Sequence, residues 1–371
     1  MFFPIRSNFI LTLLRKISLF QFRNYPEAAY NIEAKLICIC GKNGSGKTNL
    51  LDAIYTLCYT KSYFSATVQA TILHGAEAFR IEGLFEKDNK KESVICKYKN
   101  GKKEISCAGI VYDKHAEHIG KYAAVMVAPD DIEMINDGSE WRRKFMDSIL
   151  GQSDSQYLNN LLQYQKVLQQ RNAWLKMYAN DSKTDASLID YYNSLLAPAG
   201  NYIYEVRKLF LKEFMPLLQK YYGQLSADKE IATIEYQSDL GMHSLEHLLE
   251  QNVQNDLRFQ RTLKGIHKDE LVFLLNGNSL KSFGSQGQKK SFLFSLKLAQ
   301  YEYLKTKMNS SPILLLDDVF EKLDQQRMEA LLNIISNPMF GQVILTDTHE
   351  QRVKDAFGKD SVIDFIRLNH I

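Results

Sequence analysis

The stretch Gly41-Lys42-Asn43-Gly44-Ser45-Gly46-Lys47-Thr48 decides the fold of this chain. It matches the pattern G-x-x-x-x-G-K-[ST], the phosphate-binding P-loop. The apolar residues 36–40 before it have the composition of a buried strand, and the segment after it spaces Leu50, Ile54 and Leu57 along one face of a helix. Such a loop binds phosphate because its backbone N–H groups and the helix N-terminus face the anion. The sequence therefore predicts a binding site for a nucleoside triphosphate.

Each residue of this loop is a predicted contact to the nucleotide. The Lys47 side chain is expected to reach the β- and γ-phosphates, where it would also act in catalysis, and the Thr48 hydroxyl is expected to bind Mg²⁺. A chance glycine loop is the alternative, and the flanking strand and helix count against it. The predicted cofactors are ATP and Mg²⁺, and the predicted contacts are Gly41, Lys42, Asn43, Gly44, Ser45, Gly46, Lys47 and Thr48.

Length and composition limit the class of protein. The chain has 371 residues, 45% of them hydrophobic and 24% charged, which suits one large domain with an insertion or two domains. A net charge of +3 permits nucleic-acid binding but does not argue for it. The five cysteines form no C-x-x-C pair and no apolar run reaches roughly 18 residues, so we expect reduced thiols, no membrane partner and a cytoplasmic location. Residues 1–10 are expected to be an extension ahead of the first strand rather than a signal peptide.

The pattern along the chain changes twice. Residues 1–138 show mainly strand patterns around the P-loop helix, residues 139–270 show long stretches of helical spacing, and strand patterns return in 271–371. The sequence thus predicts an α/β fold, a nucleotide-binding head assembled from 1–138 and 271–371 with a mainly helical arm inserted at 139–270. Within the first part, residues 94–107 predict a hairpin with an Asn100-Gly101 type I′ turn.

A second half of the nucleotide site is predicted near the C-terminus. Residues 313–316 are consecutively apolar, as in a parallel strand buried on both faces, and Asp317 and Asp318 follow at its carboxyl end, where ligands gather. Asp317 is predicted to hold Mg²⁺ and Asp318 to orient the attacking water. Alone, the pattern fits a strand-to-loop cap equally well; the P-loop in the same chain favours catalysis.

The segment Ser285-Gln286-Gly287-Gln288 opens a predicted helix. It matches the signature motif of ABC-type ATPases, in which small residues at a helix N-terminus bind the γ-phosphate held by a second subunit. Ser285, Gly287 and Gln288 are therefore predicted ATP contacts across an ATP-dependent homodimer. Lys289 and Lys290 oppose the helix dipole, an arrangement that makes sense where an anion docks. An ordinary Gly-Ser loop is the alternative.

Two further segments complete the predicted site. Residues 321–324, Glu-Lys-Leu-Asp, resemble the D-loop that couples the two nucleotide sites of such dimers. His349 follows the last predicted strand, 342–346, where ABC-type proteins carry a switch histidine, and it is a predicted catalytic residue. A surface histidine is the equal alternative.

The long spacing between Lys47 and Ser285, and an arm too short for SMC coiled coils, narrow the class further. From about residue 12 onward the chain resembles the RecF family of bacterial recombination-mediator ATPases. Residues 265–270, Gly-Ile-His-Lys-Asp-Glu, are similar to the family's Gly-Pro-His-Arg-Asp-Asp, with Ile266 and Lys268 as departures. Other matching stretches are Phe22-Arg23-Asn24-Tyr25, Ala128-Pro129-Asp130-Asp131, Trp141-Arg142-Arg143-Lys144-Phe145-Met146-Asp147, Gln170-Arg171-Asn172 and Ser285-Gln286-Gly287-Gln288.

This resemblance implies an ATP-dependent clamp. Two heads would close over two ATP molecules, hold duplex DNA near a single-strand gap and, with RecR and RecO, favour loading of RecA in repair and replication. Asp318 in place of the Glu of most ABC ATPases agrees with RecF, and a weak, DNA-stimulated ATPase is expected. A transporter's cytoplasmic ATPase and an SMC-like structural tether are the alternatives from other classes.

Candidate DNA contacts come from two places. In the predicted hairpin, alternation puts Lys97, Lys99 and Lys102 on one face, where the repulsion between them would be relieved by a phosphate backbone. A solvated edge hairpin is the nearly equal alternative. If the hairpin does not contact phosphates, the DNA contacts are predicted in the head groove near Arg142 and Arg143.

Overall fold

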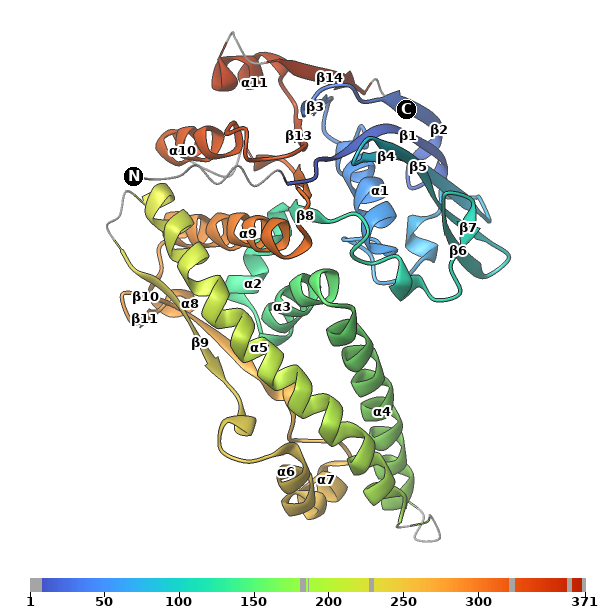
Figure 1. Cartoon of the computed structure of the whole chain (residues 1–371), viewed down its shortest axis with the longest axis vertical. Helices are drawn as coiled ribbons and strands as arrows, with labels where there is room; N and C mark the ends of the chain where they lie inside the picture. The colour runs from blue at the N-terminus through green and yellow to red at the C-terminus, as the bar shows by residue number, and fades with distance from the viewer. Residues whose placement is uncertain are drawn as a thin grey trace. The chain divides into compact units, whose positions relative to one another are not determined.

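The computed structural model describes residues 9–180, 185, 187–226, 230–319, 324–358 and 362–368, which form two compact units (Figure 1). The head comprises the described parts of Met1–Ile132, Tyr221–Lys229 and Gln286–Ile371. The arm comprises the described parts of Glu133–Lys220 and Glu230–Ser285. The described part of the insertion therefore begins earlier and ends later than the predicted range 139–270, and the short stretch 221–226 returns to the head.

The head contains a five-stranded parallel sheet in the order β14-β3-β13-β12-β8. Burial on both faces explains why β12 is apolar throughout and why β13 is apolar until Thr346 and Asp347 at its carboxyl end. Because all the strands are parallel, the ends of β3, β12 and β13 lie at one edge, where the P-loop and Asp317 meet. The strands are β3 (Leu36–Cys40), β8 (Ala124–Val127), β12 (Ile313–Leu316), β13 (Val343–Asp347) and β14 (Ile363–Arg367).

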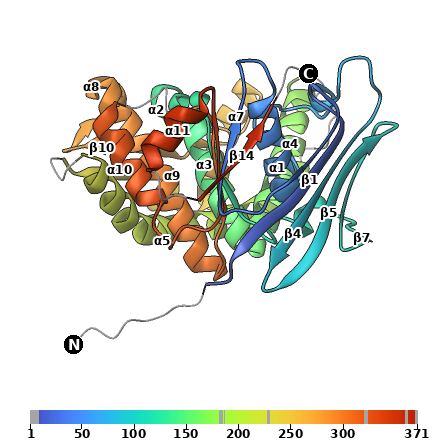
Figure 2. The ribbon, with the colours of Figure 1, turned by 90° about the horizontal axis from the view of Figure 1, so that it is seen from above.

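A six-stranded antiparallel sheet in the order β2-β1-β4-β5-β6-β7 forms the second layer of the head (Figure 2). Its strands alternate buried and exposed residues along much of their length, as expected of a sheet with one solvated face. They are β1 (Thr12–Phe22), β2 (Tyr25–Asn31), β4 (Phe79–Lys87), β5 (Lys90–Lys99), β6 (Lys102–Cys107) and β7 (Ile110–Val111).

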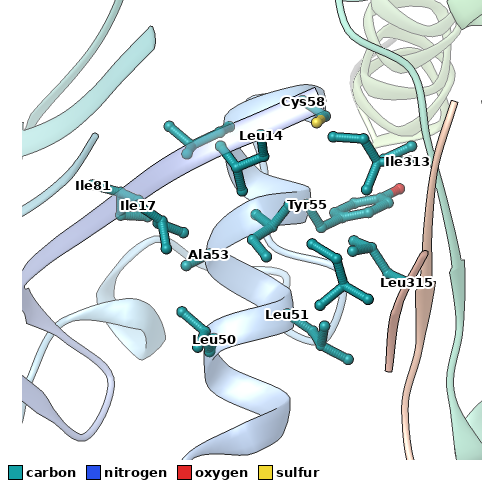
Figure 3. Packing of buried hydrophobic residues seen from close by; sticks show 14 of the residues in the cluster. Leu14, Ile17, Leu50, Leu51, Ala53, Tyr55, Cys58, Ile81, Ile313 and Leu315 are labelled. Atoms are coloured by element: carbon teal, nitrogen blue, oxygen red, sulfur yellow. The ribbon is translucent and has the colours of Figure 1, made fainter. Parts of the chain in front are cut away.

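The P-loop helix α1 (Lys47–Tyr59) is buried between these two sheets (Figure 3). Its side chains join one apolar cluster with Ile17 and Ile81 of the antiparallel sheet and with Ile313 and Leu315 of the parallel sheet. The helix therefore lacks a solvent face, which fixes the end that follows the P-loop.

The predicted hairpin is confirmed in β5 and β6. Lys99 pairs with Lys102 and Lys97 pairs with Glu104. Asn100 and Gly101 have φ values of 51° and 76°, the left-handed conformations that a type I′ turn requires.

The remaining head elements connect the sheets. The signature helix α9 (Gln286–Met308) is buried on all sides from Ser291 to Tyr301, as expected of a helix in the interior of a large domain. The other helical elements of the head are η1 (Gln69–Thr71), η2 (His115–Glu117), η3 (Pro129–Ile132), α10 (Gln325–Ile335) and α11 (Glu350–Phe357).

The arm is mainly helical, but it also contains a small antiparallel sheet in the order β11-β10-β9, of which β9 was not predicted. Its strands are β9 (Ala232–Gln237), β10 (Glu270–Leu275) and β11 (Asn278–Ser279). Its helices are α2 (Glu133–Asn136), α3 (Ser139–Ser153), α4 (Ser155–Asn180), α5 (Leu188–Ser226, whose last turns belong to the head), η4 (Asp239–Gly241), α6 (Leu245–Gln251), α7 (Val253–Phe259), η5 (Ile266–Lys268) and α8 (Leu280–Phe283). Among the described residues, no helix is both long enough and apolar enough to cross a membrane.

Candidate nucleotide-binding site

The P-loop backbone has the conformation that its glycines predict. Gly44 and Gly46 have φ values of 79° and 100°, which side chains rarely tolerate. A Cβ atom at Gly46 would also lie only 2.7 Å from the Asn24 amide nitrogen and 2.9 Å from the Tyr25 hydroxyl. The loop can therefore form only with glycine at position 46, where it turns into α1.

Lys47 is buried in this loop with neutral partners. Its Nζ donates hydrogen bonds to the carbonyl oxygens of Gly41 and Lys42, at 2.9 and 3.2 Å. The hydroxyl of Ser45 is also buried, and it has no hydrogen-bond partner among the described residues. A buried ammonium held only by carbonyls, beside a buried hydroxyl without a partner, fits a loop shaped for an anion, since buried polar groups are otherwise paired.

Asp317, the predicted Mg²⁺ ligand, lies opposite the first turn of α1. Its carboxylate accepts hydrogen bonds from the hydroxyl of Thr48, at 2.9 and 3.0 Å, and from that of Thr346, at 2.9 Å. Burial, with a smaller contribution from Asp318, raises the pKa of Asp317, although the two hydroxyls and the charge of Lys47 act in the opposite direction. A buried carboxylate that meets hydroxyls rather than a cation fits a divalent ion, and oxygen ligands of this kind suit Mg²⁺.

The two remaining predicted catalytic residues differ in how they are held. Asp318 has a left-handed backbone, with φ of 46°, and its N–H donates to the Thr346 hydroxyl at 2.9 Å. His349 is exposed at the N-terminus of α11, and its N–H donates to the carboxylate of Asp347 at 2.6 Å. The structure thus fixes Asp318 beside Asp317 but leaves the His349 side chain at the surface.

The sequence predicts no role for the Phe22-Arg23-Asn24-Tyr25 motif, but the structure shows one. The Tyr25 hydroxyl donates to the Gly46 carbonyl at 3.0 Å, and Asn24 accepts from the amide of Asn49 at 2.8 Å. Arg23 forms a 2.6 Å ion pair with the fully buried carboxylate of Asp52 in α1. The motif therefore clamps the P-loop and its helix. Thr346, which joins Asp317 to Asp318, was also missed, because a threonine at a strand end carries no distinctive pattern.

The predicted signature residues lie at the start of α9. Ser285 is exposed and directly precedes the helix, and Gly287 and Gln288 occupy its first turn. Of the D-loop-like segment, residues 321–323 lie outside the described residues, and Asp324 caps α10 by accepting from the Arg327 N–H at 3.0 Å.

The predicted DNA contacts have different surroundings. Lys99 and Lys102 are exposed on the outer face of the hairpin, whereas Lys97 forms an ion pair with Glu104 across the strands.

Arg142 is buried in the arm, where it donates to the Glu270 carboxylate at 2.7 Å and to the carbonyl oxygens of Met134 and Asp137. Arg143 is half-buried and donates to the Asp269 carbonyl at 2.7 Å. This corrects the prediction that both arginines belong to a head groove: they belong to the arm, and Arg142 is a structural residue there.

The P-loop lies beside Asp317, the Walker B aspartate, at one edge of a parallel sheet, and a helical arm is inserted before the signature helix. This arrangement defines an ATPase head of the ABC and SMC type. Residues 13–367 match the family model described as RecF/RecN/SMC N terminal domain. An SMC head from Pyrococcus furiosus has the same fold, with a TM-score of 0.56 at 14% identity over 97% of this chain and 94% of that one.

Nearer relatives specify the family. Over 342 residues the chain is 44% identical to the DNA replication and repair protein RecF of Flavobacterium johnsoniae, covering 92% of this chain and 95% of that protein. It is 40% identical over 352 residues to RecF of Cytophaga hutchinsonii, covering 95% and 93%. A solved structure of the recombination mediator protein RecF with ATP in the RecFOR pathway superposes with a TM-score of 0.86 at 28% identity, over 93% of this chain and 94% of that one. The chain belongs to the RecF family of DNA replication and repair proteins, as predicted.

Proposed function

We propose that this protein is an ATP-dependent DNA clamp of recombinational repair, in which ATP binding joins two copies of the chain. The observation that carries the proposal is the contact between Thr48 and Asp317. It joins the P-loop to the Walker B strand across most of the sequence, and the solved RecF structure with ATP supports ATP as the ligand.

Each residue of the proposed nucleotide site would have a different role. Lys47 would exchange its carbonyl partners for the β- and γ-phosphates, and Thr48 and Asp317 would hold Mg²⁺, which supplies positive charge to the phosphate oxygens when bound. Asp318, fixed beside Asp317, would orient the attacking water, and His349 would approach it from the start of α11. The shorter side chain of Asp318 supports slow, DNA-stimulated hydrolysis.

The second copy would supply the rest of the site. Ser285, Gly287 and Gln288 of one chain would bind the γ-phosphate held by the other chain, so ATP favours the closed dimer by contacts that the open form lacks. ATP would therefore act mainly as a switch, with hydrolysis reopening the clamp.

The clamp would act on duplex and gapped DNA, with RecR and RecO as partners and RecA loading as the outcome. The relatives' description as DNA replication and repair proteins and the RecFOR pathway of the solved structure support this assignment. Lys99 and Lys102 are the best exposed phosphate contacts, with Lys97 after release from Glu104.

Sedimentation with and without Mg²⁺–ATP tests the proposal. The wild-type chain should dimerise with ATP. Lys47→Ala should bind ATP roughly 10- to 100-fold more weakly, because a charge-assisted contact is lost, and should remain monomeric with its fold intact. Lys35→Ala, which removes an exposed lysine from the same unit, is the matched control. Dimerisation of Lys47→Ala at ATP levels that saturate the wild type would contradict the clamp.

The DNA part has its own test. Replacing Lys97, Lys99 and Lys102 together by Gln should weaken duplex binding and flatten its salt dependence, by roughly 0.9 in the log–log slope for each lost phosphate contact. Lys90→Gln and Lys91→Gln at the far end of β5 serve as controls. An unchanged slope in the triple variant would leave the hairpin as solvated surface.

A further inference from the structure

Arg327 of α10 lies directly against the first turn of the signature helix α9. A Cβ atom added to Gly287 would lie 3.0 Å from Arg327 Nη1 and 3.1 Å from its Cζ. The Arg327 Nε donates to the hydroxyl of Ser291 at 2.7 Å. A glycine at position 287 therefore lets the guanidinium rest directly on the helix, whereas a Cβ atom there would push it back by a few tenths of an ångström.

The guanidinium is held there by one carboxylate, that of Asp324. The Asp324 side chain is 51% exposed and that of Arg327 is 30% exposed, so both are open to solvent at the end of α9. An exposed ion pair of this kind contributes little stability, about 0–1 kcal/mol, and can be exchanged.

The position of Arg327 is electrostatically unfavourable without an anion. Two cations, Lys290 and Arg327, lie near the first turn of α9, where the helix dipole is positive. Asp324 offsets part of this charge. An incoming triphosphate would offset the rest, and the planar guanidinium can bind phosphate oxygens through two hydrogen bonds at once.

We propose that Arg327 is a second cation for the partner chain's nucleotide, and that it exchanges its ion pair with Asp324 for the γ-phosphate when two heads close. This inference rests on the proposed function, since it adds a residue to the same contact across the dimer. Asp324 holds the guanidinium over Gly287 in the free head and releases it on closure. Lys47 and Arg327 would then approach the γ-phosphate from opposite chains.

A purely structural tie between α9 and α10 predicts something different. In a purely structural tie, Asp324→Asn would loosen the guanidinium and so weaken dimerisation, though less than Arg327→Ala, which also removes the hydrogen bond to Ser291. If Arg327 binds phosphate, the two changes have opposite effects: Arg327→Ala removes the ligand contact, whereas Asp324→Asn frees the guanidinium. Asn also keeps the cap of α10, because it accepts the same backbone hydrogen bond.

Sedimentation equilibrium over a range of Mg²⁺–ATP concentrations separates these cases. Arg327→Ala should weaken ATP-dependent dimerisation at least about tenfold, with ATP binding by the monomer unchanged, and Arg327→Lys should lie in between. Asp324→Asn should dimerise as tightly as the wild type or more tightly. Arg80→Ala, which breaks an exposed Arg80–Glu82 pair on β4, is the matched control and should have no effect.

The results of these sedimentation experiments distinguish a failure of the Arg327 proposal from a failure of the proposed clamp function. A wild-type chain that stays monomeric with ATP overturns the proposed clamp. A wild-type chain that dimerises while Arg327→Ala dimerises equally well overturns only the role of Arg327. Weaker dimerisation of Asp324→Asn also overturns it, and this result decides the question if Arg327→Ala fails to fold. Ser285→Arg, which should block closure by bulk, marks complete loss in the same assay.

Discussion

The head and the arm both bury charged side chains, but they surround these charges differently. In the arm, Arg171 and Asp256 are fully buried and form a 2.7 Å ion pair. The Asp256 carboxylate also accepts from the N–H of Leu263 and from the amide of Asn252, each at 2.9 Å. In the nucleotide site of the head, Asp317 meets hydroxyls and Lys47 meets carbonyls.

The difference belongs to the site and not to the head as a whole. Elsewhere in the head, the buried Lys297 of α9 forms a 3.0 Å ion pair with Asp131, which also binds the Tyr63 hydroxyl. Where the fold supplies the opposite charge, the buried group holds elements together. Where it supplies only neutral dipoles, a ligand must bring the opposite charge, and this distinguishes a binding site from architecture.

The largest expected effect on stability concerns the buried Arg171–Asp256 ion pair of the arm. Asp256→Ala leaves Arg171 charged and buried without its carboxylate, so the arm should lose about 3–5 kcal/mol of stability. Denaturant unfolding followed by tryptophan fluorescence measures it, because both tryptophans, Trp141 and Trp174, lie in the arm. Asp239→Ala, which breaks the exposed Lys264–Asp239 pair, should cost no more than about 1 kcal/mol. Equal losses in the two variants would contradict the distinction.

A smaller effect concerns pH and the buried His267 of the arm. Its Nδ1 lies 2.8 Å from the Tyr164 hydroxyl and its Nε2 lies 3.0 Å from the Thr262 carbonyl, an arrangement that suits a neutral ring. Burial, with help from Lys268, Arg143 and Arg171, lowers the pKa of His267 to about 4.

Because this pKa is lower in the folded than in the unfolded chain, the unfolded chain binds more protons between the two values. The stability that neutral His267 contributes is present above the unfolded pKa of about 6.5 and is lost as pH falls toward 4, by at most about 1.4 kcal/mol per pH unit. Unfolding of wild type and His267→Gln, compared at pH 6.5 and 5.5, measures this loss. A stability difference that does not change with pH would show that the histidine is not buried neutral.

The sequence was sufficient for features set by short-range chemistry. The P-loop, its strand 36–40 and its helix depend on glycines and apolar spacing over a few residues, and the hairpin register follows from its Asn100-Gly101 turn. The Walker B strand was predictable because burial on both faces leaves an unbroken apolar run. Each of these predictions is confirmed.

Features that depend on distant partners were not predictable in the same way. Arg142 was predicted to contact DNA, but it pairs with Glu270, which is distant in the sequence. No pattern near Arg142 indicates this partner. The same holds for Arg327 beside Gly287 and for Arg23 with Asp52. The arm extends past residue 270 because β10 pairs with β9, a strand too short and too mixed in composition to stand out, and β11 pairs in turn with β10.

The smallest expected effect on stability concerns the buried Asp317 of the nucleotide site. Asp317 is buried and Lys47 acts on it only through space, without a direct ion pair, so Asp317→Asn should leave the nucleotide-free head as stable as wild type or more stable by roughly 1 kcal/mol. An asparagine oxygen can still accept from the Thr48 or Thr346 hydroxyl. Differential scanning calorimetry in EDTA measures the change, and added Mg²⁺–ATP should then stabilise the wild type more than the variant, because Asn is the weaker ligand.

Asp347 provides the matched control at the same sheet edge. It is equally buried, but it is paired with Arg352 at 2.7 Å, so its opposite charge comes from within the fold. Asp347→Asn should therefore lose stability in EDTA, where Asp317→Asn does not. If both variants lost stability alike, Asp317 would be part of the architecture, and the argument that its missing opposite charge is a bound Mg²⁺ would fail.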